Sequence, residues 1–181
     1  PTTMYGVTKV ACETLGTYYA ERHGVDFRSV RFPGLLNTAA PGNGSSDYAN
    51  AMYFGATDGS GSATSFVRPQ ARIPFMYMED AVRALIRLAA ADESKLTRRV
   101  YNITAFAAPS AGELADSISA EVPGFSVYYE PDARERSVDS WPDDFDDGPA
   151  RRDWGWQPEV ADLETMTRKL LADLRALRPD P

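Results

Sequence analysis

The chain opens with PTTMYGVTK at residues 1–9, and this stretch decides how the rest is interpreted. From about Val7 to Arg22, apolar residues recur every three or four positions, which predicts a helix, and Gly24 supplies its end. If the helix already includes Tyr5, then Tyr5 and Lys9 lie on one face, about one turn apart. The spacing alone is common, and its ordinary interpretation is a helix pair without chemistry.

Tyrosine and lysine at this spacing can also form a proton-transfer pair. An enzyme that removes a hydride from an alcohol must also remove the hydroxyl proton, and a free tyrosine, with a pKa of about 10, is a poor base at neutral pH. An ammonium about 4 Å away stabilises a phenolate by roughly 4 kcal/mol at an effective dielectric of about 20. Tyr5 and Lys9 are therefore candidate acid–base residues.

Outward from this helix, helices and strands alternate along the chain. The stretch at 26–32 (DFRSVRF) predicts a buried strand that ends at Pro33-Gly34. Residues 37–65 are rich in Gly, Ser, Ala, Asn and Asp, which predicts loops around one helical piece at 47–57. The alternation predicts an α/β fold with a parallel sheet covered by helices. The further predictions are strands at 73–78, 99–104 and 125–129, helices at 110–121 and 161–177, and a loop at 131–149.

The predicted helices carry readable signals. Asp80 is the expected N-cap of a helix that places Val82, Leu85, Ile86 and Ala89 on one apolar face. In the next helix, Leu114 and Ile118 are expected to point inward. The last helix has apolar residues at regular spacing: Leu163, Met166, Leu170, Leu174 and Leu177.

Composition bounds the class of protein. At 181 residues the chain is the size of one domain, and its formal net charge of −7, with no basic stripe, argues against nucleic acid and anionic membranes as partners. No apolar run approaches the roughly 20 residues that span a bilayer, so we expect a cytoplasmic protein with small-molecule partners. With Cys12 and His23 as the single cysteine and histidine, neither an internal disulfide nor a Cys/His metal site can form, and no metal is expected.

The opening stretch, together with Glu13 and with RFPGL at 31–35, resembles the extended short-chain dehydrogenase/reductase family. In that family the catalytic YxxxK opens a helix as YGxTK, and the next strand ends in R-x-P-G at the nicotinamide. The resemblance implies NAD as cofactor, Tyr5 as proton donor and acceptor, and Lys9 as the ligand of the nicotinamide ribose. It also implies that the backbone at Pro33, Gly34 and Leu35 contacts the nicotinamide.

The resemblance covers only the carboxyl-terminal half of that family's Rossmann-like fold. It implies that residues 1–37 end an NAD-binding domain and that 38–181 form a small substrate-binding lobe with segments that return to that domain. No GxxGxxG pyrophosphate loop occurs in the sequence. We therefore expect the isolated chain to bind NAD poorly and to be inactive alone.

Several segments, in order, resemble the short-chain type of L-threonine 3-dehydrogenases, which oxidise the β-hydroxyl of L-threonine to 2-amino-3-ketobutyrate with NAD. This resemblance implies that Ser45 and Ser46, where relatives commonly carry threonine, bind the amino-acid head group, and that Trp141 lines the pocket. Alternatively, the serines cap the helix at Asp47 and Trp141 packs in a loop. The segments are TMYGVTK at 3–9, GSSDYA at 44–49, IPFMYMEDA at 73–81, YNITA at 101–105, SWP at 140–142 and DWGW at 153–156.

Other functions compete with this one. The chain could belong to a nucleotide-sugar epimerase or dehydratase of the same family, or be a non-catalytic fragment that associates with another chain. The family's dimers imply a homodimer through the helix that carries Tyr5 and Lys9.

Trp154 and Trp156 are expected to be packing residues, and Arg72 either reaches a carboxylate or pairs with Glu79 or Asp80. An acidic cluster suits an ammonium-bearing substrate better than a diphosphate, or is simply a solvated loop: Asp139, Asp143, Asp144, Asp146 and Asp147.

Overall fold

A strand that changes partner at Pro33 organises the fold in the computed structural model, which describes residues 1–177. Before the proline, β1 (Ser29–Arg31) runs parallel to β5 (Val100–Asn102). After it, β2 (Gly34–Leu36) runs parallel to β4 (Phe75–Tyr77). Proline has no N–H to donate to a ladder, so the pairing breaks there and resumes with a new neighbour.

The observed elements alternate as the sequence predicts, and the strands pair in parallel. A third parallel pair joins β3 (Ser62–Ser65) to β6 (Ser126–Tyr129). The predicted α/β fold with parallel strands is therefore confirmed. The helices are α1 (Met4–His23), α2 (Asp47–Gly55), α3 (Met78–Ala90), α4 (Ala111–Glu121), α5 (Glu135–Val138), α6 (Gly148–Trp154) and α7 (Leu163–Leu177), with a 3-10 turn η1 (Glu93–Lys95).

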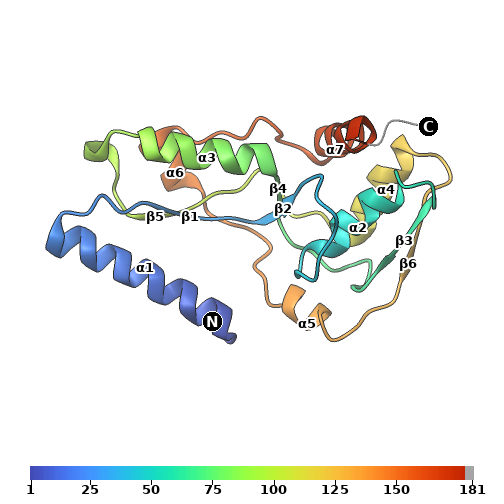
Figure 1. Ribbon diagram of the computed structural model, residues 1–181, viewed down its shortest axis with the longest axis horizontal. Helices are drawn as coiled ribbons and strands as arrows, with labels where there is room; N and C mark the ends of the chain where they lie inside the picture. Colours follow the sequence, from blue (N-terminus) through green and yellow to red (C-terminus); the bar gives the residue numbers. More distant parts are fainter. Residues whose placement is uncertain (178–181) are drawn as a thin grey trace.

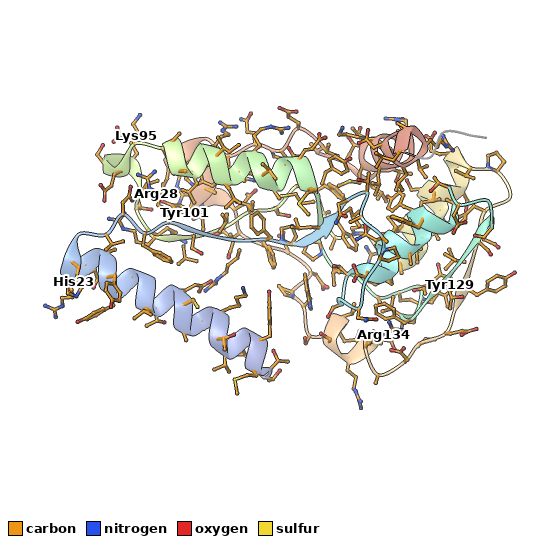
Figure 2. The ribbon with its side chains drawn as sticks, in the orientation of Figure 1. His23, Arg28, Lys95, Tyr101, Tyr129 and Arg134 are labelled. Carbon is orange, nitrogen blue, oxygen red and sulfur yellow. The ribbon has the colours of Figure 1, made fainter. Side chains whose placement is uncertain are left out.

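Two hydrophobic cores lie at opposite ends of the switching strand. One forms around β5, α3 and α6, and Trp156 is its largest fully buried side chain. The other gathers α2, α4 and α7. Figure 1 shows α1 on one side of β1 and β5 and α3 on the other. In Figure 2, His23, Arg28 and Tyr101 mark the first end, and Tyr129 and Arg134 mark the second. The predicted domain boundary after residue 37 stays a prediction.

Helix α1 lies on the strands through small and polar residues. Thr3 caps it by accepting the Gly6 N–H at 3.1 Å, and Gly24 ends it in the left-handed conformation, with φ of 66°. The helix has no buried residue, and its predicted apolar positions, such as Leu15, point to solvent. The half-buried face that meets the strands consists of Gly6, Glu13, Gly16, Thr17 and Ala20.

Helix α3 corrects one prediction. Asp80 is not its N-cap, because the helix begins at Met78 and Asp80 lies inside the first turn. Its buried carboxylate instead accepts the backbone N–H groups of Glu159 and Val160, each at 3.0 Å, and so holds the segment that leads to α7. The apolar face expected from the sequence is exposed, and the buried stripe is formed by other residues: Ala81, Ala84 and Leu88.

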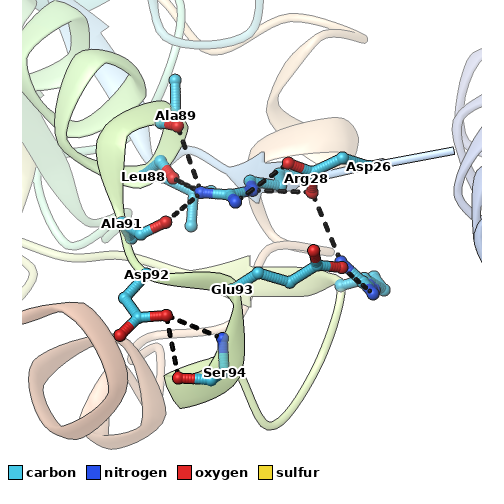
Figure 3. Close-up of polar contacts among 9 residues, drawn as sticks. Asp26, Arg28, Leu88, Ala89, Ala91, Asp92, Glu93 and Ser94 are labelled. Carbon is cyan, nitrogen blue, oxygen red and sulfur yellow. Dashed lines mark hydrogen bonds and ion pairs between the residues drawn. The ribbon is translucent and has the colours of Figure 1, made fainter.

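Arg28 ties β1 to the end of α3 (Figure 3). Its Nη1 donates to the carbonyl oxygens of Leu88 at 2.6 Å, Ala89 at 3.1 Å and Ala91 at 2.7 Å. The Leu88 carbonyl also accepts the N–H of the C-cap residue Ala91, so Arg28 adds a second donor at the end of the helix. Asp26 binds the other edge of the guanidinium, and this hydrogen bond raises the pKa of Arg28 and lowers that of Asp26. The strand is thereby fixed along α3.

Other elements differ in extent from the predictions. The strand expected at 26–32 is only β1, and it is half-buried rather than buried because β5 is its one partner within residues 1–177. Strands β2 and β3 were not predicted, and the loop expected at 131–149 contains α5 and the start of α6. Leu114 and Ile118 point inward as predicted, and in α7 only Leu177 departs from the expected face, being 65% exposed. No helix among residues 1–177 is long and apolar enough to cross a membrane.

Candidate active site

Tyr5 and Lys9 form an exposed pair at the start of α1. Because Thr3 is the N-cap, the helix includes Tyr5, as the proton-transfer interpretation requires. The Lys9 ammonium lies 5.2 Å from the centroid of the Tyr5 ring, within the range of a cation–π contact. Within residues 1–177 neither polar group has a hydrogen bond or ion pair, and Tyr5 is 73% exposed. Both groups are therefore available to a ligand.

The partner switch at Pro33 and Gly34 provides a second part of the site. Both residues are buried, and Gly34 donates its N–H to the Pro74 carbonyl at 3.0 Å. A Cβ on Gly34 would lie 2.9 Å from the Phe75 ring and 3.1 Å from Cβ of Ser46, so only glycine lets the strand pass. Ligands of parallel α/β sheets bind at the carboxyl ends of strands where the order changes, which is the position of Pro33 after β1.

Ser46 therefore lies beside the strand that the resemblance assigns to the nicotinamide. It is the N-cap of α2, yet its hydroxyl makes no capping bond and has no hydrogen-bond partner within residues 1–177. The turn before α2 is built instead by Asp47, whose carboxylate accepts the N–H groups of Gly42 at 3.1 Å and Gly44 at 2.6 Å. The alternative in which a Gly/Ser turn caps the helix at Asp47 is borne out for the backbone, since Ser46 is the N-cap residue and Asp47 donates its N–H to the Gly44 carbonyl at 3.1 Å. The Ser46 hydroxyl takes no part in the cap, so the proposed role of this hydroxyl in binding stays a prediction.

Ser45 points the other way, toward the α5 segment. Its Oγ lies 2.9 Å from Oγ of Ser137, an exposed residue that no sequence motif singles out. Trp141 follows on the same segment and is half-buried. Its backbone N–H donates to the Val138 carbonyl at 3.0 Å, and its ring packs against the core that contains α2. The structure thus brings Ser45, Ser137 and the Trp141 segment to one end of the molecule.

Arginines hold the α5 segment in place. Arg68 donates to both carboxylate oxygens of Asp139, at 2.9 and 2.8 Å, and its backbone N–H donates to Glu135 at 2.7 Å. The bond to Arg68 lowers the pKa of Asp139. The Arg134 guanidinium lies 3.8 Å from the centroid of the Phe66 ring. These contacts fix the segment that carries Ser137 and Trp141.

The acidic cluster is engaged locally, which favours the interpretation as a structural loop. Asp139 pairs with Arg68, and Asp147 pairs with Arg151 at 2.8 Å. Asp144 and Asp146 accept nearby backbone N–H groups. Arg72 pairs with neither Glu79 nor Asp80. It forms a bidentate bridge to Glu113, at 2.8 and 2.7 Å, because the fold places the start of α4 beside it.

Comparison with known proteins adds to this geometry. The sequence profile of the NAD dependent epimerase/dehydratase family matches residues 1–104. An uncharacterized epimerase/dehydratase of Staphylococcus haemolyticus is 44% identical over 174 residues, covering 94% of this chain and 54% of that protein. The chain thus spans about half the length of the curated relatives it matches.

Solved structures agree in fold. The crystal structure of L-threonine dehydrogenase from Phytophthora infestans superposes with a TM-score of 0.93 at 43% identity, covering 98% of this chain and 57% of that one. The holo form of a GalE-like L-threonine dehydrogenase from Cupriavidus necator gives 0.92 at 42% identity, covering 96% and 56%. The Rossmann-like fold of the extended short-chain dehydrogenase type is confirmed, and the chain belongs to the NAD dependent epimerase/dehydratase family.

Proposed function

We propose that this chain carries the proton-transfer and substrate-recognition half of an NAD-dependent dehydrogenase that oxidises L-threonine to 2-amino-3-ketobutyrate. The observation that carries the proposal is the placement of Tyr5 and Lys9 one turn apart at the exposed start of α1, where neither polar group has a hydrogen bond or ion pair within residues 1–177. It is supported by similarity to solved structures named L-threonine dehydrogenases.

The residues present fit the nicotinamide end of NAD. Within residues 1–177 the Lys9 ammonium, which lies over the Tyr5 ring, and the Tyr5 phenol have no hydrogen-bond or ion-pair partner, so both are suitable donors for ribose hydroxyls. In our proposal the backbone of buried Pro33 and Gly34 and of half-buried Leu35 contacts the nicotinamide ring, and NAD, when bound, accepts the hydride. The sequence supplies no glycine-rich loop for the pyrophosphate, so that contact must come from outside the chain.

Tyr5 acts as the general base in this proposal. Its phenolate takes the β-hydroxyl proton, and the hydrogen on the same carbon leaves as a hydride with the electron pair of the broken C–H bond, so that a ketone forms. Lys9 stabilises the phenolate by its positive charge and holds Tyr5 and the ribose in one arrangement. Positioning and proton transfer together account for the requirement for both residues.

Substrate recognition falls to hydroxyls and one indole. Ser46 Oγ, beside Gly34, is available to the carboxylate or ammonium group of the amino acid. Ser45, paired with Ser137, and the indole of Trp141 border the same end of the molecule. A small amino acid fits this set of uncharged groups, which offers hydrogen bonds and an apolar surface.

A nucleotide-sugar epimerase is the competing function, since curated relatives are named as epimerases/dehydratases. A sugar diphosphate requires free cations. Arg68 is bound by Asp139 and Glu135, and Arg72 by Glu113, so neither guanidinium is available without breaking an ion pair. This observation removes Arg68 and Arg72 as ligands of a diphosphate. Arg136 of α5 has no ion pair within residues 1–177, so the choice between the two functions depends on the assay.

A second copy of the protein is the proposed partner of α1. The outward face of the helix carries exposed apolar side chains that no element within residues 1–177 covers, among them Val7, Leu15 and Tyr18. Burying such a stripe against its symmetry mate is favourable and gives a closed two-fold dimer. This proposal does not depend on the identity of the substrate.

The experiment is an NADH-absorbance assay on the full-length protein that contains this chain. We expect NAD reduction with L-threonine, none with a UDP-sugar, and at least a thousandfold loss in Tyr5→Phe, which keeps the ring and removes the proton-transferring group. Ser46→Ala serves as the recognition variant, with KM raised about tenfold by loss of a hydrogen bond to a charged group. Because epimerisation is redox-neutral and gives no net NADH, the UDP-sugar arm is also analysed by chromatography. Conversion of a UDP-sugar to its epimer, with no NAD reduction by L-threonine, would replace the proposal with epimerisation.

A further inference from the structure

Two contacts hold α1 on the strands. Near its end, the Phe27 ring packs on Gly16, where a Cβ would come within 2.4 Å of the ring. In its middle, Arg31 donates Nε to Glu13 Oε1 at 2.8 Å and Nη2 to Oε2 at 2.5 Å. Within residues 1–177 this fork is the one side-chain hydrogen bond or ion pair that joins α1 to another element.

The fork joins the two parts of the candidate active site. Glu13 lies one turn beyond Lys9, which lies one turn beyond Tyr5, so the three side chains share a face of α1. Arg31 ends β1, two residues before Pro33. Two parallel N–H···O bonds fix rotation as well as distance, so the fork sets the register of the helix against the partner switch.

The fork also settles a competition for charge. Lys9 and Glu13 are spaced as an i, i+4 pair, and opposite charges at that spacing attract on a helix surface. Arg31 occupies both carboxylate oxygens of Glu13, whose side chain is 17% exposed. This hydrogen bond raises the pKa of Arg31. With Glu13 held by Arg31, Lys9 keeps its ammonium on the Tyr5 ring.

We propose that Arg31 is a positioning residue that sequesters Glu13 and so keeps Lys9 directed at Tyr5. Its catalytic meaning rests on the proposed function, whereas the exchange of ion-pair partners does not. Removing Arg31 frees Glu13 to capture Lys9. Removing Glu13 as well eliminates the competitor.

Competitive acetylation with trace acetic anhydride tests the exchange without NAD or substrate. The chain's lysines are Lys9, Lys95 and Lys169, and exposed Lys95 serves as the internal reference in mass spectrometry. Ion pairing lowers the fraction of neutral amine, so Arg31→Gln should lower the Lys9-to-Lys95 labelling ratio roughly twofold. Glu13→Gln should match the wild type, and the Glu13→Gln, Arg31→Gln double variant should recover it.

Glu13→Gln is the matched control for folding, because it breaks the same fork as Arg31→Gln. Equal labelling ratios in Arg31→Gln and the double variant, or an unchanged ratio in Arg31→Gln, would overturn the proposal. The labelling ratios do not depend on turnover. If the wild type fails to oxidise threonine, the proposed function is overturned, while the proposed exchange of ion-pair partners is still tested by the labelling.

The pH dependence of turnover in the full-length protein is the second measurement. With Lys9 drawn away, the phenolate of Tyr5 loses its nearby charge, so the acid limb of the pH–rate profile should move to higher pH in Arg31→Gln and return in the double variant. A purely mechanical role of the fork would lower kcat similarly in both single variants and leave the limb in place.

Discussion

At the scale of single residues, Gly34 is the tightest point of the candidate site. The approach of its α-carbon to Phe75 and Ser46 keeps β2 against β4 and brings Ser46, proposed for substrate recognition, beside the strand proposed to contact the nicotinamide. The absence of a side chain at Gly34 therefore has a packing reason, the close approach of Phe75 and Ser46, in addition to the role that the R-x-P-G resemblance implies.

Gly34→Ala should lower the free energy of unfolding by about 1–3 kcal/mol, because the added methyl overpacks a buried contact. Chemical denaturation measures it. In a double-mutant cycle with Phe75→Leu, the two costs should be less than additive, since the smaller side chain makes room for the methyl. Additive costs would mean that Phe75 is not what excludes a side chain at this position.

The sequence predicted the placement of residues that are separated by a fixed helical spacing, while their catalytic role stays a prediction. Tyr5 and Lys9 were identifiable because a helix places such a pair on one face, and Thr3 caps that helix in the required position. Ser137 could not be identified, because its contact with Ser45 depends on where a segment 92 positions away folds back. The partners of Arg31 and Arg72 are of the same long-range kind.

At the scale of elements, the seating of α1 depends on a glycine facing an aromatic ring. Gly16→Ala should favour an isolated helix by about 1 kcal/mol through propensity. Here we expect the opposite sign, a loss of about 1–3 kcal/mol of unfolding free energy, because the methyl would lie 2.4 Å from the Phe27 ring. Thermal denaturation checks the sign, and Phe27→Leu in the same background should recover part of the loss. A stabilised Gly16→Ala would show that the ring yields freely.

Asp153 fastens α6 to β5. Its carboxylate accepts Thr97 N–H at 2.9 Å, Thr97 Oγ1 at 2.6 Å and Tyr101 Oη at 2.7 Å. Burial acts to raise the pKa of Asp153, but these hydrogen bonds outweigh it and the pKa lies below its ordinary value. A carboxyl with a lowered pKa contributes stability above its unfolded pKa, about 3.9, and that contribution is lost as pH falls through the folded pKa.

Asp153→Asn should therefore cost about 1–3 kcal/mol at neutral pH. Its unfolding free energy should also fall less steeply than the wild type's as the pH drops below about 4. Urea denaturation at several pH values measures both effects. Asp144→Asn is the control, because that carboxylate is exposed and accepts only the N–H of neighbouring Phe145. A variant as acid-sensitive as the wild type would contradict this account.

The kind and order of the elements were predictable from the sequence, but which face of a helix is buried was harder to predict. Helix α3 carries two apolar stripes, and the pattern alone does not say which one this chain buries. The choice follows from Asp80, which must reach the Glu159 and Val160 amides and so turns Ala84 inward. Strands β2 and β3 are short, and their sequences, GLL and SATS, lack a period long enough to detect.

At the scale of the whole molecule, the outward face of α1 contacts either solvent or, in the proposed dimer, a second copy of the protein. If the proposed dimer forms, Leu15→Glu should yield a monomer in size-exclusion chromatography with light scattering, because a charge would be buried in the interface. Leu177→Glu, at a 65% exposed position on α7, is the matched control and should leave the mass unchanged. Equal masses for wild type and Leu15→Glu would exclude α1 as the interface.

The single strand that crosses Pro33 has an evolutionary consequence. The groups proposed for proton chemistry lie on α1, beside β1 and β5, and those proposed for recognition lie beside the core of α2, α4 and α7, on the other side of the partner switch. Duplicated genes with this fold can diverge in the second core, exchanging the hydroxyls at 45 and 46 or the α5 segment, while the first core is inherited unchanged. Relatives that share residues 1–34 can then differ in the molecules they act upon.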